Sequence, residues 1–268
     1  MGRATRKAQG KKMKRTFVAT AALLSVLVSG IAFGDSHEKE NRRFVPVETF
    51  ACNYLEGKGP ADLDAVIENW NAWMDEHDQH DYFAVTLTPF YFGPDTFDVA
   101  WLGSWPGGEA MGRGQDLWVS QGSEINAQFF EVLSCDSHSN FATTELKAPE
   151  GPTPESVVLA FSDCTGPDSP EGWDQLMTNL DAWSAYLTSN GYHQGNWIMF
   201  PVYGGGGVKF DFKLVKGYDN HTQLGQDYQR FSDNADWEKQ GELLGGLMDC
   251  DDSRVYQATV RRQPPDDE

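Results

Sequence analysis

Basic side chains are scarce in this sequence. Its 268 residues include 21 Lys and Arg against 40 Asp and Glu, which gives a formal net charge of −19. A chain of this charge repels the phosphates of nucleic acid and of anionic lipid, so we predict neither as a partner. The carboxylates are scattered and no EF-hand loop spacing occurs, so a solvated acidic surface is favoured over a cation site.

Long apolar runs are absent beyond the N-terminus. Residues 16–34 form a short apolar run that follows seven basic side chains within residues 1–15, the pattern of a secretory signal. Cleavage before Asp35 would remove these seven basic groups and no acidic ones, leaving a net charge of −26. We therefore predict a signal peptide over residues 1–34 and a periplasmic or secreted protein without membrane contact after cleavage. An uncleaved membrane anchor is the alternative.

Signatures of common catalytic and metal sites are also missing. No Gly-x-Ser-x-Gly stretch occurs, and no two of the four cysteines lie two to four residues apart, as in a zinc site. His77 and His80 lie three apart near the end of a predicted helix, which is a metal-binding spacing or simply a solvated helix end. We predict no metal and no cofactor, and the sequence leaves open whether the protein is an enzyme.

The sequence contains an internal duplication. Residues 45–148 align with residues 155–262, with offsets that drift only from 110 to 115. All four cysteines match in order, because Cys52 aligns with Cys164 and Cys135 with Cys250. Two repeats over residues 35–148 and 155–268 are therefore predicted, joined by a Pro- and Gly-rich linker over residues 149–154.

Each repeat has the element order strand, helix, strand, strand, helix, strand. Apolar residues recur with a 3.6-residue period over residues 63–74 and again over residues 173–183, and alternate with polar residues over residues 83–88. Such a βαββαβ unit is ferredoxin-like, with one antiparallel sheet and both helices on one face.

Two such sheets in one chain resemble the dimeric α+β barrel superfamily, which includes antibiotic-biosynthesis-monooxygenase-like and NIPSNAP-like proteins. The predicted fold class is α+β, with two tandem ferredoxin-like repeats whose antiparallel sheets pack into an intrachain α+β barrel.

The cysteines predict one disulfide inside each repeat. Four cysteines allow three pairings, but a single ancestral unit had to satisfy its own pair. We therefore predict the bridges Cys52–Cys135 and Cys164–Cys250.

Strand alternation predicts a partly polar lining inside the barrel. With Cys52 facing the helices, its neighbours face the interior, and Phe97, Val99 and Trp101 are expected under the helices. Apolar walls with a few polar groups are typical of small-molecule sites. The predicted ligand-binding residues are Asn53, Thr86, Thr88, Asp98, Asp163, Asn196, Asp211 and Lys213.

Asp98 and Asp211 occupy equivalent positions in the two repeats and allow two interpretations. As buried carboxylates they could act as acid or base. Alternatively, each opens a strand and binds nearby backbone amides.

The predicted function is binding of a small molecule between the repeats. The resemblance implies an alternative, a metal-independent monooxygenase or isomerase. Heme-degrading relatives use an Asn, a Trp and an axial His; Asn53 and Trp101 or Trp105 match two roles, but residues 113–134 contain no His. A third interpretation is an extracellular carbohydrate-binding or interaction module. It would use tryptophans outside the periodic positions, namely Trp105, Trp118 and Trp237.

Overall fold

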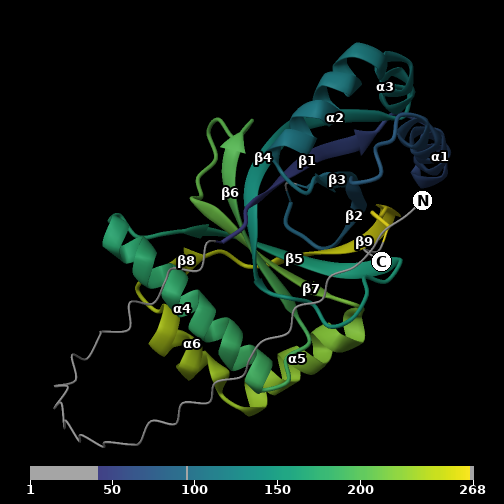
Figure 1. Cartoon of the computed structure of the whole chain (residues 1–268). Helices are drawn as coiled ribbons and strands as arrows, with labels where there is room; N and C mark the ends of the chain where they lie inside the picture. The colour runs from purple at the N-terminus through teal and green to yellow at the C-terminus, as the bar shows by residue number, and fades with distance from the viewer. Residues whose placement is uncertain (1–41, 95, 266–268) are drawn as a thin grey trace, which may run out of the picture. The chain divides into compact units, whose positions relative to one another are not determined.

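The computed structural model describes residues 42–94 and 96–265. The predicted signal peptide lies outside these residues. The first repeat comprises β1 (Val45–Tyr54), α1 (Pro60–Glu76), β2 (Phe83–Tyr91), β3 (Val99–Ser104), α2 (Gly108–Gln121), α3 (Ser123–Phe130) and β4 (Leu133–Lys147). The second repeat comprises β5 (Ser156–Thr165), α4 (Pro170–Ser189), β6 (Gly195–Tyr203), β7 (Phe212–Tyr218), α5 (His221–Asp233), α6 (Asp236–Leu244), β8 (Asp249–Cys250) and β9 (Arg254–Arg262) (Figure 1).

The first helix of each repeat begins at the predicted proline. Pro60 and Pro170 stand in the first turns of α1 and α4, where the backbone N–H is not needed. Ser169 caps α4 by accepting a hydrogen bond from the backbone N–H of Gly172 at 3.1 Å. The predicted apolar stripes are buried faces, formed by Leu63, Val66, Ile67, Trp70 and Met74 in α1 and by Leu176, Leu180, Trp183 and Leu187 in α4.

Eight antiparallel strands close into a barrel. Their order is β7-β6-β4-β1-β3-β2-β9-β5, and a pairing of β5 with β7 closes the ring. The pairings of β4 with β6 and of β2 with β9 join the repeats edge to edge. A separate four-stranded sheet would leave two unpaired edges, and this closure satisfies both. The predicted fold class is therefore confirmed, with an edge-to-edge junction that the sequence did not specify.

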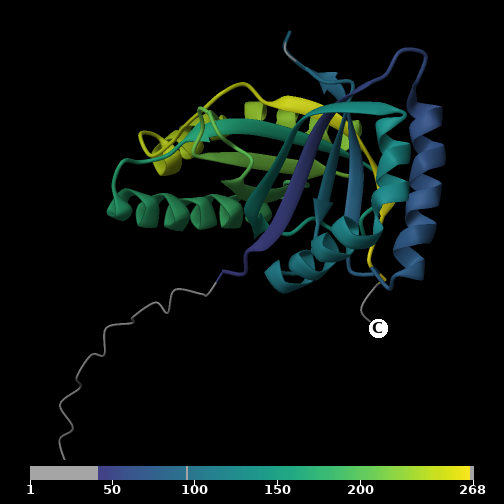
Figure 2. The ribbon, with the colours of Figure 1, turned by 90° about the horizontal axis from the view of Figure 1, so that it is seen from above.

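The helices cover two separate outer faces of the barrel. Helices α1 to α3 pack on the sheet of the first repeat and α4 to α6 on that of the second (Figures 1 and 2). One apolar cluster lies under α1 to α3, two lie under α4 to α6, and another fills the barrel interior. Among the described residues, no helix is both long and apolar enough to cross a bilayer.

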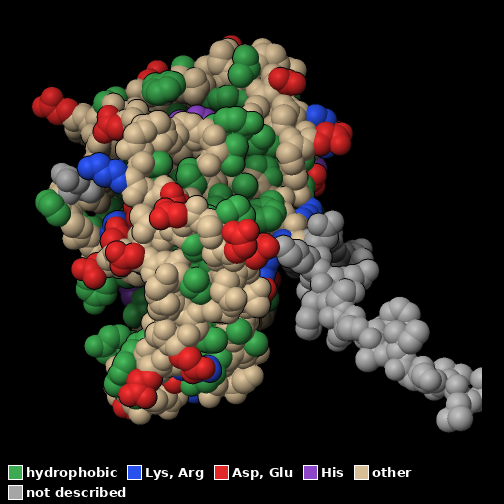
Figure 3. All heavy atoms as spheres, turned by 90° about the vertical axis from the view of Figure 1, so that its left-hand side faces the viewer, with side chains coloured by type: hydrophobic (Ala, Val, Ile, Leu, Met, Phe, Trp, Pro, Cys, Tyr) green, Lys and Arg blue, Asp and Glu red, His purple; other side chains and the backbone are tan. Residues whose placement is uncertain are grey.

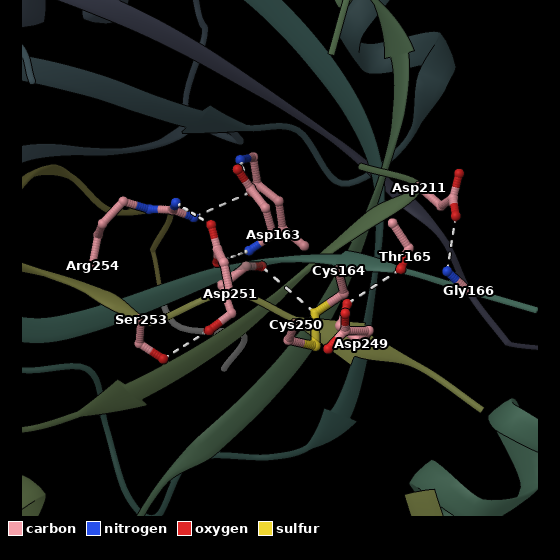
Figure 4. The surroundings of a disulfide bond; sticks show 12 residues. Asp163, Cys164, Thr165, Gly166, Asp211, Asp249, Cys250, Asp251, Ser253 and Arg254 are labelled. Carbon is pink, nitrogen blue, oxygen red and sulfur yellow. Dashed lines mark hydrogen bonds and ion pairs between the residues drawn. A yellow bond between two sulfur atoms is a disulfide. The ribbon is translucent and has the colours of Figure 1, made fainter. Parts of the chain in front are cut away.

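Both predicted disulfides are present. Cys52 bonds Cys135, and Cys164 bonds Cys250, in each case between directly paired residues of neighbouring strands. Figure 4 shows the second bridge with its surroundings. The bridges close loops of 83 and 86 residues. In the chain-entropy description, each such bridge stabilises the fold by about 4.5 kcal/mol.

The barrel interior is mainly apolar. Val85, Leu87, Phe161 and Met199 are buried there and pack with Tyr256. The polar groups that strand alternation predicted for this space are largely elsewhere, as described below. Both faces of β2 are buried, so the strand's alternation did not reveal which face meets the helices.

Candidate functional site

A cavity of about 700 Å³ lies between the sheet of the first repeat and helices α1 to α3. We call it the first-repeat cavity. Its walls are rich in rings from both layers, namely Phe50, Trp70, Trp73, Tyr82, Trp101, Trp105, Trp118, Phe129 and Phe130. It therefore lies on the outer face of the barrel sheet, whereas the sequence predicted a site in the interior.

The barrel interior retains a smaller cavity of about 240 Å³. It extends from interior side chains such as Val85 and Met199 to linker residues, including Pro149 and Pro152. Thr143 contributes a buried hydroxyl to this space. The larger volume and the aromatic walls favour the first-repeat cavity as the main site.

The predicted threonines and Asn196 do not line the barrel interior. Thr86 faces the first-repeat cavity and accepts a hydrogen bond from Arg261 Nε at 2.8 Å, because Val85 and Leu87 take the interior positions. Thr88 is exposed. Asn196 accepts a hydrogen bond from Gln194 Nε2 at 2.8 Å, while its neighbour Trp197 packs in the interior.

Asp98 and Asp211 make the same contact in both repeats. Asp98 accepts a hydrogen bond from the backbone N–H of Tyr54 at 3.0 Å, and Asp211 accepts one from Gly166 at 2.8 Å (Figure 4). Both residues are exposed. These contacts agree with the interpretation in which each Asp binds a nearby backbone amide.

Two pairs of predicted site residues do come together. Asn53 Oδ1 accepts a hydrogen bond from the backbone N–H of Asp98 at 3.2 Å. Lys213 forms an ion pair with Asp163. The carboxylate of Asp163 also lies 3.3 Å from Arg254 (Figure 4). Burial lowers the pKa of Lys213, and the bond to Asp163 opposes this shift. Ligand binding by these residues remains a prediction.

Phe97 was wrongly expected under the helices. It packs in the interior cluster with Tyr256, at a ring separation of 5.5 Å. Strand β3 begins only at Val99, so the alternation that correctly places Val99 and Trp101 under the helices does not extend to Phe97.

The predicted tryptophan platforms are mostly not exposed. Trp105 is buried and Trp118 packs against the first-repeat core, where both line the cavity. Trp237 on α6 is 53% exposed.

His80 lies near Asp75 and Asp78 at 3.8 and 3.7 Å, yet the described residues contain no group of three His, Cys, Asp or Glu side chains that could hold a metal ion. Acidic side chains are spread over the face shown in Figure 3.

A hydrogen-bonded chain crosses the sheet wall of the first-repeat cavity. Trp101 Nε1 donates to the Tyr82 hydroxyl at 3.0 Å, and that hydroxyl donates to Glu48 Oε1 at 2.6 Å. Glu48 Oε2 lies 3.0 Å from His138 Nε2. The side chain of Glu48 is 11% exposed and that of His138 is 52% exposed, so the chain runs from the core toward solvent.

Gly103 makes room for this chain. It lies directly opposite Glu48 in the β1–β3 register, and a Cβ atom there would stand 1.6 Å from the Tyr82 hydroxyl oxygen. Burial, and next the charge of Glu48, raise the pKa of Tyr82 well above its ordinary value. The phenol therefore stays protonated and remains a donor to Glu48.

Glu48, Tyr82 and His138 were not predicted as a group from the sequence. The signal that would have found them is a difference in residue type at equivalent positions of the two repeats. In the β5–β7 register, Ala160 pairs with Lys216 where the first repeat pairs Glu48 with Gly103.

The imidazole of His138 is also fixed from the side. Its ring stacks on Phe50 with centroids 3.7 Å apart and planes 12° apart, and these two residues are register partners on β4 and β1. In the second repeat, Ser162 and Ser253 share a hydrogen bond of 2.7 Å at the equivalent positions. The histidine site is therefore confined to the first repeat.

This chain is similar to known proteins in its fold and not in its sequence. No protein-family model matches the chain, and no curated protein matches its sequence. A candidate monooxygenase from Fusobacterium nucleatum subsp. nucleatum has a TM-score of 0.50 at 8% identity, covering 81% of this chain and 93% of that one. The fold is that of the dimeric α+β barrel proteins.

Two further solved structures are similar at slightly lower scores. A candidate chlorite dismutase has a TM-score of 0.49 at 10% identity, covering 82% of this chain and 96% of that one. A heme-binding protein from Thermus thermophilus has a TM-score of 0.47 at 12% identity, covering 80% of this chain and 91% of that one.

The first-repeat cavity does not fit heme. Heme needs an axial ligand for its iron and cationic partners for its propionates. Among the described residues that line the cavity, none is Lys or Arg, and His138 is the only imidazole. That imidazole is hydrogen-bonded through Nε2 to Glu48 and covered on one face by Phe50, and the described lining offers the propionates no cationic partner.

Proposed function

We propose that the protein binds a flat, largely apolar small molecule, neutral or positively charged, in the first-repeat cavity. The observation that carries this proposal is the cavity itself. Its volume of about 700 Å³ falls in the range of small-molecule sites, which are mostly apolar with a few placed polar groups. Trp73 and Trp118 meet edge to face at 5.5 Å in its wall and offer planar surfaces to a ring system.

The charge of the cavity supports a neutral or cationic ligand. Glu48 and Asp136 are its two described acidic residues, and its described lining contains no basic side chain other than the imidazole of His138. The whole chain has a net charge of −19, which further disfavours an anion. Aromatic faces also attract cations.

The contrast with the second repeat supports a functional cavity. Where the first repeat has Val99 and Trp101 on β3, the second has Phe212 and Leu214 on β7. Phe212 is fully buried in the core under α4 to α6. A protein interior is normally close-packed, so a cavity of about 700 Å³ under α1 to α3 supports an occupant.

Binding is tested with three pyrene derivatives that share one ring system. Pyrenemethanol and pyrenemethylamine are expected to quench the tryptophan fluorescence, and pyrenecarboxylate is expected to bind at least about tenfold more weakly, which corresponds to about 1.4 kcal/mol. Trp118→Ala weakens binding, whereas Trp237→Ala on the second repeat leaves it unchanged. Equal binding of the anion, or equal effects of the two variants, contradicts the proposal. Hemin is expected to give no sharpened Soret band.

Metal-independent monooxygenase activity on the bound molecule is a second candidate function. It is supported by the polar chain from Trp101 to His138 in the cavity wall and by the fold shared with a candidate monooxygenase. Oxygen uptake by the protein with a bound phenol, unaffected by a chelator, would support it. No uptake with any bound ring compound would count against it.

We also propose that the protein is exported. Two disulfides support this, because such bonds persist in the periplasm or outside the cell and are rare in the cytosol. Mass spectrometry of protein from these fractions is expected to show a chain that begins at Asp35. A full-length chain confined to the cytosol would contradict the proposal.

A further inference from the structure

We propose that His138 is an acid–base catalytic residue of the first-repeat cavity, and that its Nδ1 takes a proton from a phenol-like group of the bound molecule. This inference rests on the proposed binding function. Glu48, Tyr82 and Trp101 are positioning residues, because they act through the imidazole.

The direction of the hydrogen-bonded chain assigns the tautomer of His138. An indole N–H can only donate, so Tyr82 accepts from Trp101 and must use its own proton toward Glu48. A carboxylate only accepts, so the proton between Glu48 and His138 belongs to Nε2 of the imidazole. Nδ1 is thereby left with a free lone pair, which makes it the basic atom of the ring.

The carboxylate also prepares the ring for its charged form. When Nδ1 takes a proton, the imidazolium faces Glu48 at 3.0 Å and is stabilised by its negative charge. A carboxylate behind an imidazole fixes tautomer and orientation in the same way in serine hydrolases. The stack on Phe50 restricts rotation of the ring, so both constraints hold one orientation.

The step is balanced without an oxidant. The O–H bond of the ligand breaks, its electron pair stays on oxygen, and the proton forms a bond to Nδ1. The proton stays on the imidazolium while the ligand is bound, so the phenolate and the imidazolium form an ion pair and the bound complex gains no net charge. The titratable groups among the described lining residues are Glu48, Tyr82, Asp136 and His138, of which Asp136 accepts a hydrogen bond from Asn53 at 3.2 Å.

The same residues are absent from the second repeat, which gives an internal comparison. Ala160 stands where Glu48 does and Ser253 where His138 does. In the first repeat, the residues of this chain line the cavity.

The test compares 1-hydroxypyrene with 1-methoxypyrene, which has the same ring but no acidic proton. Absorbance distinguishes bound phenol from bound phenolate. We expect the phenolate-to-phenol ratio of the bound probe to be at least about tenfold higher in the wild type than in His138→Gln, a difference of one pKa unit. Glu48→Gln lowers the ratio as well, and His221→Gln, on α5 of the second repeat, serves as the matched control with no effect.

The outcomes separate the two proposals. If 1-methoxypyrene binds all variants equally but the ratio is the same in wild type and His138→Gln, the acid–base role is overturned and the binding function stands. If neither probe binds, both proposals fail. Independently of any ligand, nitrogen chemical shifts are expected to show His138 protonated at Nε2, and a loss of this preference in Glu48→Gln; an Nδ1–H tautomer in the wild type would also overturn the inference.

Discussion

The substitution Gly103→Ala provides a sharp test of the polar chain. The new Cβ would lie 1.6 Å from the hydroxyl oxygen of Tyr82 and 2.3 Å from its Cζ, so the phenol must move. Tyr82 is 4% exposed and packs against Trp105 at a ring separation of 4.5 Å, so little free space is available to it.

The expected loss of stability is large for a single methyl group. Overpacking a core costs about 1–3 kcal/mol, and losing a hydrogen bond to a charged acceptor costs about 1.5–3 kcal/mol. We expect the free energy of unfolding to fall by about 3–5 kcal/mol, and Tm to fall on the order of 10 °C for a domain of this size. Urea unfolding followed by circular dichroism measures the first quantity.

Two comparisons isolate the cause. Gly112→Ala on α2 meets nothing within 4 Å and is expected to raise stability by up to about 1 kcal/mol. In a double-mutant cycle, Tyr82→Phe should cost much less in the Gly103→Ala background than in the wild type, because the bond to Glu48 is already broken. A Gly103→Ala variant within about 0.5 kcal/mol of the wild type would refute the role given to this glycine.

Three further predictions concern stability. Replacing Cys164 and Cys250 together by Ser is expected to lower the free energy of unfolding by about 4 kcal/mol, and an unchanged urea midpoint would contradict this. Asp227 is 2% exposed and accepts hydrogen bonds from the backbone N–H groups of His193 and Gln194 at 3.0 to 3.1 Å. Asp227→Asn is therefore expected to lower the free energy of unfolding by about 2–3 kcal/mol, measured by thermal unfolding. A loss below about 0.5 kcal/mol would be too small for this role. Burial raises the pKa of Tyr82 above 10.0, so the contribution of Tyr82 to the free energy of unfolding is complete below pH 10 and declines as pH rises further. Tyr82→Phe should therefore flatten the alkaline loss of stability. An equal slope of unfolding free energy against pH in both proteins would argue against this.

The sequence by itself determined the architecture of each repeat. The aligned cysteines gave the disulfide pairing, because each repeat had to be stable alone. The apolar period predicted α1 and α4, since a helix exposes one face to the core every 3.6 residues.

Only the tertiary structure decided where the cavity lies. Both faces of the barrel strands are buried, one under the helices and one in the interior. Alternation therefore sorts the residues of a strand onto two faces but does not predict which face meets the helices. This is why Thr86 was assigned to the wrong side, although Cys52 was placed correctly. The chain from Trp101 to His138 joins residues up to 90 positions apart, and only strand register brings them within hydrogen-bond distance. The one-dimensional pattern also does not contain how side-chain volumes combine at facing positions, and these volumes decide that a cavity remains under α1 to α3.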